Sequence, residues 1–260
     1  MGIRLRLKYR LDHTQSRKTI QSFTPQTTSQ VNTKEDFLNG KVLLFNKDRE
    51  WTSFDLVNKA RNLIRKRFEI KKIKVGHAGT LDPLATGLMI VCCGKETKNI
   101  DQYQGQDKTY ITTIKLGEST PSYDLETEVD QKAPIEHINI ELIEKVLKDF
   151  TGEIEQVPPM FSAINVNGQR AYKLAREGKS VELKKRIVRI NNIKILDFDL
   201  PYLKVEISCS KGTYIRSLAR DIGLALDSLG YLTELTRTQI GNYKIEDAIS
   251  IKEFEELLSN

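Results

Sequence analysis

The amino-acid sequence predicts an α+β fold with a largely antiparallel sheet. Strand-like and helix-like segments follow one another without the strict alternation that βαβ units require. Residues 108–117 alternate apolar and polar side chains with the period of a half-buried strand, and residues 181–210 hold two or three further strands in succession. The 260 residues are enough for one large domain with a single core, or for two small domains.

The first half of the chain is expected to begin with a strand at residues 40–47. The segment Thr52–Asp55 has the form of a capping box, which predicts the start of a helix with one apolar stripe. That stripe would consist of Phe54, Val57, Ala60 and Ile64. Residues 88–93 form the longest apolar run and predict a buried strand, and a short helix that includes Lys98 is expected at 94–104.

The second half of the chain is expected to mix further strands and helices. The expected elements are the strand at 108–117, a helix from about 139 to 150, paired strands within 152–165 that lead to a turn at 167–168, a short helix at 170–177, the strands within 181–210, a helix opened by 212–216, a strand at 235–243 and a terminal helix from 250. The helix opened by 212–216 would bury Ile215, Leu218, Ile222 and Leu226. In 181–210, an exposed face would carry Lys184, Lys185, Arg186 and Arg189.

Composition excludes several classes of protein. No stretch approaches 18 consecutive apolar residues, so the sequence predicts no membrane span. Cys92 and Cys93 are adjacent and Cys209 is distant, which argues against a disulfide framework and fits a reducing cytoplasm. With only 3 histidines and no His or Cys pair at zinc-site spacing, we expect no metal.

The net charge of +6 is unevenly distributed along the chain. Residues 59–74 contain eight basic side chains against Glu69 alone, whereas residues 118–153 contain ten acidic side chains against three lysines. A basic face of this kind neutralises phosphates and attracts polyanions, which favours a nucleic-acid partner. A helix face that is merely solvated explains the same charges, and the composition leaves both alternatives open.

The stretch 75–98 (VGHAGTLDPLATGLMIVCCGKETK) combines several glycines with few polar groups and runs directly into the apolar strand. Glycine is placed where the backbone needs a positive φ or where a ligand approaches closely, so this pattern predicts a shaped turn. Taken alone, Asp82-Pro83 is typical of a helix start, with an aspartate cap followed by proline. Taken alone, His77 is typical of a loop histidine.

Within that stretch, GHAGTLDPLATG closely resembles the signature of the bacterial-type tRNA pseudouridine synthase B family. The resemblance covers residues 38 to about 247. It implies a central mixed sheet flanked by helices and an isomerase that converts the uridine at position 55 of the TΨC arm to pseudouridine, without metal or cofactor. The family's usual LLxDKPxGxTS reads LLFNKDREWTS here, with Asp48 and Glu50 in place of proline and glycine, so the role of Lys47 stays open.

Pseudouridine formation breaks an N-glycosidic bond, and a carboxylate can stabilise or trap the sugar cation that develops. Asp82 is the only carboxylate of the glycine-rich loop, and the resemblance assigns it the role of nucleophile. Attack on ribose C1′, attack on the uracil ring and a glycal route remain alternatives. The resemblance also assigns Arg216, in GTYIR, as a catalytic residue beside Asp82. In the first turn of a helix an arginine opposes the helix dipole, so a carboxylate partner is expected.

The target uridine lies in a folded arm, so the enzyme has to extrude the base and stack it on an aromatic ring. The resemblance assigns Tyr110, in the K-x-Y pattern, to that stacking and to a role as a base. It assigns Tyr214 and Leu235 to further substrate contacts. His77 would fill the space that the flipped nucleotide leaves. As core or loop residues, these side chains need no functional explanation.

Three segments are expected along the chain. Residues 1–36 are basic and rich in serine and threonine, which predicts a disordered extension, with a misassigned start or an organellar transit peptide as alternatives. Residues 37–247 form the catalytic domain, and 248–260 form a short C-terminal helix in place of the family's PUA domain. The expected partner is the T-arm of tRNA, bound by a cytoplasmic monomer without guide RNA or membrane. The alternatives are a non-catalytic tRNA-binding or folding protein on the same scaffold and a guide-RNA-dependent relative that modifies rRNA.

Overall fold

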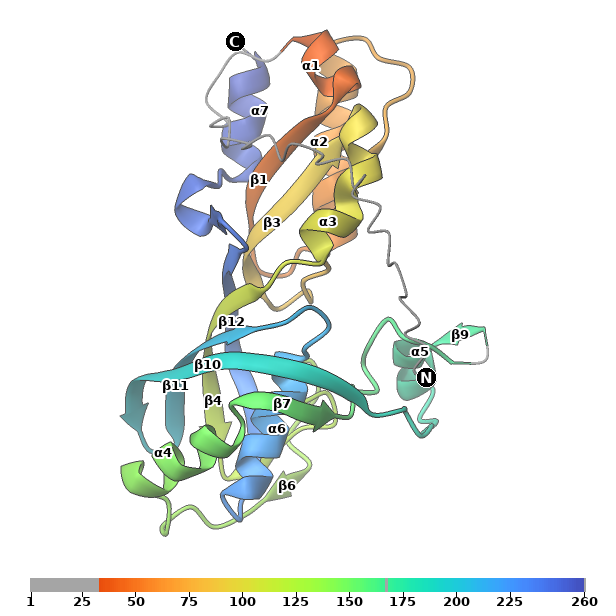
Figure 1. Ribbon diagram of the computed structural model, residues 1–260. Coiled ribbons are helices and arrows are strands. Elements are labelled where there is room, and N and C mark those ends of the chain that lie inside the picture. The colour runs from red at the N-terminus through yellow and green to blue at the C-terminus, as the bar shows by residue number, and fades with distance from the viewer. Residues whose placement is uncertain (1–32, 167, 260) are drawn as a thin grey trace, which may run out of the picture.

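The computed structural model describes residues 33–166 and 168–259. Figure 1 shows an elongated molecule with two lobes stacked along its long axis. The strands β4 (Lys108–Leu116) and β12 (Gly230–Ile240) run between the lobes and connect them. Helices lie against the sheet in both lobes, which confirms the predicted α+β class.

Within the described residues, one nine-stranded sheet has the strand order β1-β3-β12-β4-β11-β10-β7, with β13 added to β12 and β2 to β3. Its remaining strands are β1 (Lys41–Lys47), β2 (Val75–His77), β3 (Thr86–Cys93), β7 (Gly152–Gln156), β10 (Arg186–Asp199), β11 (Tyr202–Cys209) and β13 (Tyr243–Lys244). The ladders of this sheet are antiparallel except the one between β3 and β12. The prediction of a mixed, largely antiparallel sheet is therefore confirmed. Two further ladders join β5 (Glu118–Ser119) to β6 (Gln131–Lys132) and β8 (Asn165–Val166) to β9 (Gln169–Arg170).

The helices occur close to the positions that periodicity and capping residues predict. They are α1 (Lys34–Asn39), α2 (Ser53–Arg67), η1 (Gly94–Asn99), α3 (Ile100–Gln104), α4 (Ile140–Asp149), α5 (Ala171–Arg176), α6 (Ile215–Ala225), η2 (Ile245–Asp247) and α7 (Ile251–Ser259). In Figure 1, α1, α2, α3 and α7 surround β1 and β3 in the upper lobe, while α4 and α6 belong to the lower lobe.

Helix α2 starts at the predicted capping box and buries Val57, Ala60 and Ile64 of the predicted stripe, but not Phe54. The Thr52 hydroxyl accepts a hydrogen bond from the Asp55 N–H at 3.1 Å, and the Asp55 carboxylate accepts one from the Thr52 N–H at 3.1 Å. Phe54, expected in the apolar stripe, is 65% exposed, and Leu56 is buried in its place. The reason is Ser53, which turns inward to bind another loop. Phe54 follows about 100° further round the helix and points to solvent.

Helix α6 buries the predicted stripe of Ile215, Leu218, Ile222 and Leu226. It packs unusually close to β12, because a side chain at Gly223 would collide with the backbone of Gly230. This close approach holds the C-terminal end of α6 against the start of β12.

Three expectations from the sequence are wrong in detail. Strand β7 does not form a hairpin within residues 152–165 but pairs with β10, which lies 30 residues further along the chain. Strand β12 begins at Gly230, five residues before the predicted start, because its first residues pair with the end of β4. Helix α1 begins at Lys34, inside the predicted extension 1–36, with Thr33 as its cap and Phe37 buried. Residues 1–32 lie outside the described part of the chain.

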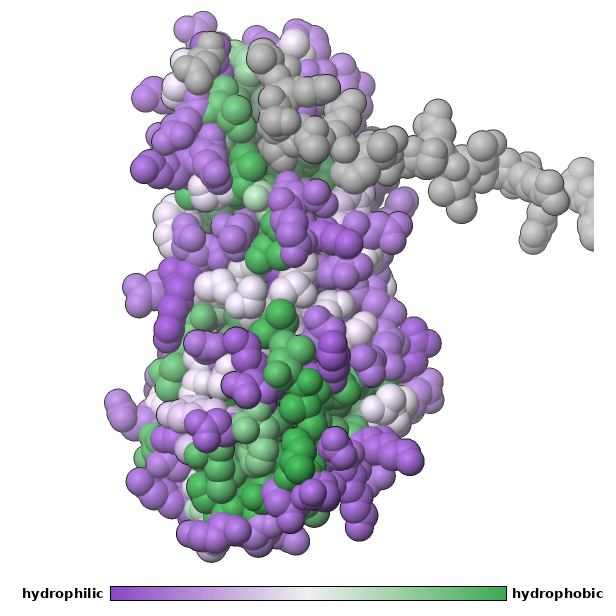
Figure 2. Space-filling model, turned by 90° about the vertical axis from the view of Figure 1, so that its left-hand side faces the viewer, coloured by the Kyte–Doolittle hydropathy of each residue, from purple (hydrophilic) through white to green (hydrophobic). Residues whose placement is uncertain are grey.

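Apolar side chains gather on the surface of the lower lobe, as Figure 2 shows in green. The β10–β11 hairpin presents Leu196, Leu200 and Tyr202, which are exposed. In the described residues, no helix combines the length and the apolar character that crossing a bilayer would need.

Candidate active site

Asp82 lies in the loop between β2 and β3, where the backbone makes a tight turn. The Ala85 N–H donates to the Asp82 carbonyl at 3.1 Å, and the chain enters β3 at Thr86. No helix begins at Asp82-Pro83, so the helix-start alternative is wrong. The carboxylate is held at the surface of the turn, with its side chain 36% exposed.

Both neighbours of Asp82 are fixed by hydrogen bonds to the start of α2 and to the segment before it. The Ser53 hydroxyl accepts from the Leu81 N–H at 2.8 Å and donates to the Leu81 carbonyl at 3.0 Å. The Pro83 carbonyl accepts from the Glu50 N–H at 2.8 Å and from the Lys47 ammonium at 3.3 Å. The aspartate therefore stands between two anchored residues, which preorganises its position.

Lys47 thereby acquires a structural role that the altered sequence motif did not reveal. Its side chain is 1% exposed, and its ammonium also donates to the carbonyls of Trp51 at 2.7 Å and Asp48 at 2.9 Å. Burial lowers the pKa of Lys47 to about 8, although the nearby charge of Asp82 opposes that shift. A buried lysine that donates to three backbone carbonyls therefore anchors the loop.

We expect Lys47→Met to lower the free energy of unfolding by about 3 kcal/mol, because it leaves buried carbonyl groups without donors. Urea denaturation of both proteins measures this difference. Lys95→Met is the matched control, since Lys95 is exposed and its ammonium bonds only the Asn39 side chain. A Lys47→Met loss no larger than that of the control would contradict the anchoring role.

The lowered pKa of Lys47 gives this prediction a pH dependence. Between about pH 8 and its ordinary value of 10.5, the unfolded chain binds more protons at this residue than the folded chain does. Stability contributed by this group therefore rises with pH across that window. The wild type should gain stability relative to Lys47→Met as the pH rises from 8 to 10.5, and a constant difference would contradict the shift.

Arg237 anchors the same loop from the sheet side, and no sequence pattern predicted this role. The side chain is 1% exposed, its Nε donates to the Leu88 carbonyl at 2.8 Å and its Nη2 to the Gly79 carbonyl at 3.2 Å. Arg237 pairs with Gly87 in the parallel ladder between β12 and β3. Gly87 has φ +107°, and a side chain there would collide with the Arg237 backbone. Glycine at this position therefore lets the two strands meet beneath the loop.

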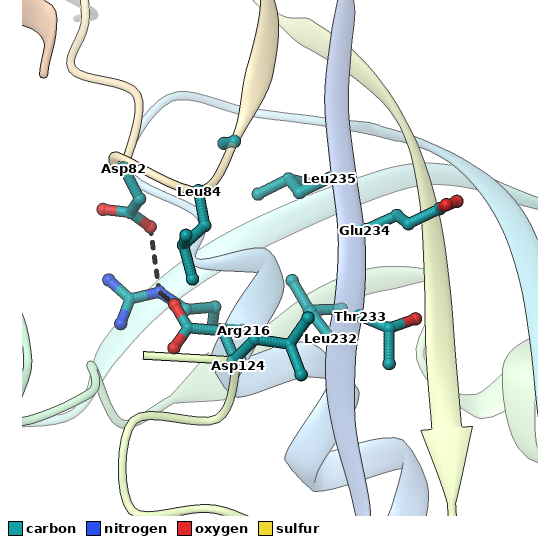
Figure 3. A pocket seen from close by; sticks show the side chains of 10 residues that line it. Asp82, Leu84, Asp124, Arg216, Leu232, Thr233, Glu234 and Leu235 are labelled. Carbon is teal, nitrogen blue, oxygen red and sulfur yellow. Dashed lines mark ion pairs between the residues drawn. The ribbon is translucent and has the colours of Figure 1, made fainter. Parts of the chain in front are cut away.

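Arg216, in the first turn of α6, is the central charge of the site (Figure 3). Its Nε lies 2.9 Å from Oδ2 of Asp82 and 3.6 Å from Oδ2 of Asp124. Nε makes no aligned hydrogen bond, so these contacts are ion pairs by distance. Nη1 donates to the Ser122 carbonyl at 3.1 Å and Nη2 to the Phe161 carbonyl at 2.8 Å. The expected carboxylate partner of Arg216 is present, and the guanidinium is fixed on three sides.

Asp124 is a second carboxylate that sequence reasoning missed. It is 7% exposed, and burial raises its pKa while the charge of Arg216 opposes the shift. In the sequence it lies among the ten acidic residues of 118–153, where nothing distinguishes it from a solvated charge. The backbone of the preceding Tyr123 has φ +62°, a conformation that places Asp124 toward Arg216 and that a sequence pattern does not reveal.

A cleft of about 440 Å³ opens in front of this ion pair and is lined by the described residues Asp82, Tyr110, Tyr214, Arg216 and Leu235. The structure thus brings five of the six predicted site residues together. A smaller pocket lies on the other side of the ion pair, between Leu84, Asp124 and β12 (Figure 3). Asp82, Arg216 and Leu235 line both spaces.

Tyr110 forms part of the buried wall of the cleft. It is 8% exposed and lies on β4 between Ile207 of β11 and Arg237 of β12. Burial raises the pKa of Tyr110, while the charge of Arg237 opposes that shift. The hydroxyl therefore remains protonated at neutral pH. The alternation that predicted the strand also placed this residue correctly on its buried face.

Tyr214 is the N-cap residue of α6, and hydrogen bonds to its backbone N–H and carbonyl hold it in place. The buried Gln156 amide accepts from the Tyr214 N–H at 2.8 Å and donates to the Tyr214 carbonyl at 3.1 Å. The Tyr214 ring lies under the guanidinium of Arg186, with 4.5 Å from Cζ to the ring centroid. Arg186, predicted on an exposed face with Lys184, Lys185 and Arg189, is instead half-buried and lines the cleft.

His77 is the predicted site residue that the structure leaves apart. It ends strand β2, where it pairs with Val91 of β3, and it is half-buried. Burial and the charge of Arg237 lower the pKa of His77, so the ring is neutral at pH 7. It is not among the described residues that line the cleft.

The basic residues of the 59–74 cluster that lie at the end of α2 are also remote from the aspartate. Arg65, Lys66 and Arg67 occupy the last turn of α2, whereas Ser53 at its first turn binds the loop. A helix of this length separates its ends by about 20 Å. Lys59 pairs with Glu255 at 2.8 Å. Contacts from this cluster would therefore fall on a region of a ligand distant from the reacting group.

The chemistry that the cleft supports follows from these groups. A preorganised, ionisable carboxylate faces a cavity with a buried aromatic wall and several cations, which suits nucleophilic or charge-stabilising catalysis on an anionic ligand with a planar group. In residues 33–166 and 168–259, no group of three or more His, Cys, Asp or Glu side chains is arranged to hold a metal ion.

Comparison of the sequence with protein families gives a match over more than half of the chain. The model described as TruB family pseudouridylate synthase, N-terminal domain, matches residues 65–215. A curated relative from Parabacteroides distasonis, named tRNA pseudouridine synthase B, is 56% identical over 86% of this chain and 95% of its own length. The protein of the same name from Flavobacterium johnsoniae is 52% identical over 87% of this chain and 99% of its own.

Solved structures share the fold at lower identity. A chain of the Cbf5-Nop10-Gar1 complex has a TM-score of 0.61 and 26% identity over 82% of this chain and 52% of that one. A chain of an H/ACA RNP bound to a substrate RNA containing 2′-deoxyuridine has a TM-score of 0.60 and 25% identity over 85% of this chain and 53% of that one. The present chain therefore spans about half the length of these structural neighbours.

Proposed function

Because the chain belongs to the TruB family of pseudouridylate synthases, we propose that it is an isomerase that converts a uridine of tRNA to pseudouridine, and that this uridine is the one at position 55 in the T-arm. The observation that carries the proposal is the position of Asp82. Its carboxylate lies on the cleft wall, 2.9 Å from a buried guanidinium, between two neighbours that are fixed by hydrogen bonds.

In the reaction, the bond from ribose C1′ to N1 of uracil breaks and a bond from C1′ to C5 forms. The proton on C5 leaves after the new bond has formed, and N1 gains a proton, so the change is an isomerisation without any cofactor. Asp82 acts as the nucleophile, at C1′ or at the uracil ring, or promotes a glycal route. Arg216 keeps the Asp82 carboxylate in place through an ion pair, and Asp124 forms a second ion pair with the same Nε of Arg216.

The uridine reaches the carboxylate only when it is extruded from the folded RNA. The Tyr110 ring, buried on the cleft wall, supports the flipped base by stacking. Its raised pKa favours this role over that of a base, because little phenolate is present at neutral pH. Tyr214 and Leu235 complete the pocket around the nucleotide, and His77 contacts the RNA that the base leaves behind.

The proposal also covers the oligomeric state of the enzyme and its location in the cell. It works as a monomer in the bacterial cytoplasm, recognises the T-arm directly and uses no guide RNA. A non-catalytic tRNA-binding protein would have no need for a carboxylate that is fixed and exposed to the cleft, so the geometry favours the enzyme over that alternative.

The test is pseudouridine mapping on unmodified tRNA after incubation with the purified protein. The expected result is one pseudouridine at position 55, formed without added metal, nucleotide or RNA. Modification at another position would refute the proposed target, and unmodified tRNA that nevertheless binds tightly would support the non-catalytic alternative.

A further inference from the structure

The cleft contains more positive charge than its carboxylate neutralises. Among the described residues, its lining includes the cations Lys108, Arg186, Lys211, Arg216 and Arg237, with Asp82 as the only carboxylate. Asp82 and Asp124 both form ion pairs with Arg216. In the described residues, the other four cations form no ion pair. Unpaired charge on a cavity wall attracts an anionic group of the ligand.

Two of these cations, Lys108 and Arg237, already donate hydrogen bonds to backbone carbonyls. The buried Lys108 ammonium donates to the carbonyls of Gln104, at 2.6 Å, and Gln106. Arg237 donates to the carbonyls that fix the Asp82 loop. Both contribute charge to the cleft, and their donors are largely committed to other partners.

Arg186 differs, because two of its donor nitrogens are buried without any acceptor. Its Nε and Nη2 are shielded from solvent, and neither makes a hydrogen bond. The plane of the guanidinium is fixed by stacking on Tyr214, at 4.5 Å. A buried N–H group without a partner costs free energy, and an acceptor supplied by a ligand would recover that cost.

We propose that Arg186 binds a backbone phosphate of the RNA, next to the uridine that enters the cleft; this rests on the proposed function. Nε and Nη2 form one edge of the planar guanidinium, and two parallel N–H groups match two oxygens of a phosphate. Lys108 and Lys211 line the same cleft and strengthen the attraction for an anion. Stacking on Tyr214 restrains the guanidinium for this contact. Arg186 thereby fixes the sugar while the glycosidic bond is broken.

A cycle of protein and RNA changes tests this contact. The changes are Arg186→Gln and a single neutral methylphosphonate linkage, placed on the 5′ or the 3′ side of the target uridine, and kcat/KM is measured for all combinations at one salt concentration. We expect each change alone to lower kcat/KM about 10- to 100-fold. For one of the two linkages, the combined change should be no more than about threefold worse than Arg186→Gln alone, because both remove the same contact.

Lys194→Gln is the matched control, since it removes one positive charge from an exposed site on the same strand, about 25 Å further along. It should stay within about threefold of the wild type. Arg186→Lys keeps the charge and should recover part of the loss, which also covers the case in which Arg186→Gln folds poorly.

Losses that multiply independently for both linkages would overturn the proposal and would indicate that Arg186 contacts the base or acts only through the general field. An Arg186→Gln enzyme within threefold of the wild type would overturn it as well. Failure of the wild type to isomerise the unsubstituted RNA would instead refute the proposed function, so the two failures can be distinguished.

Discussion

Asp82→Asn is expected to reduce isomerisation by at least about 10⁴-fold, to an undetectable level. The amide has the shape of the carboxylate but is a poor nucleophile and carries no charge to stabilise a developing sugar cation. The loop should keep its conformation, because its hydrogen bonds come from Ser53, Glu50 and Lys47 and from backbone groups of the neighbours of Asp82. Arg216 still has Asp124 as an ionic partner.

Single-turnover pseudouridine formation and tRNA binding by the same variant give the decisive comparison. Binding should stay within about tenfold of the wild type, or roughly 1.4 kcal/mol. Activity close to that of the wild type would disprove the nucleophile assignment. A parallel loss of binding and melting temperature would show that Asp82 mainly holds the loop together.

The parts of the fold that the sequence predicted correctly are those set by local patterns. The Thr52 capping box depends on residues three apart, and the strand at 108–116 depends on a period of two. The stripe of α6 depends on a helical period and is fully buried as expected. Pairing between distant segments has no such pattern. For that reason the partner of β7 and the start of β12 were misassigned.

The same distinction between local patterns and long-range contacts explains which residues of the site could be predicted from the sequence. Asp82, Tyr110 and Arg216 stand in short motifs whose residues carry the resemblance, and the structure places them around one cleft. Lys47 and Asp124 reach the site through long-range contacts, and their burial could not be anticipated from a lysine in an altered motif or an aspartate in an acidic loop. The stripe predicted for α2 is buried at Val57, Ala60 and Ile64, whereas Phe54 is exposed beside Ser53, whose hydroxyl faces Leu81.

Arg216→Met should lower kcat about 100- to 1,000-fold and change the pH dependence of the reaction. The substitution fills similar volume but removes the cation between Asp82 and Asp124. Two carboxylates without a shared cation disfavour each other's ionised form, and burial already raises the pKa of Asp124. The pair will therefore hold a proton up to a higher pH than in the wild type. Activity of the variant should rise with pH over a range in which the wild type is constant.

The pH profile of single-turnover kcat separates this electrostatic role from a structural one. Arg216→Met also leaves the Ser122 and Phe161 carbonyls without donors, so we expect about 3 kcal/mol lower stability, and the assay temperature has to stay below the melting transition. Adding Asp124→Asn to Arg216→Met removes one of the two carboxylates, and the ionisation of the remaining one should return toward lower pH. If the single and the double variant share the flat profile of the wild type, Arg216 does not control the charge of Asp82 and acts only by holding α6 to residues 122 and 161.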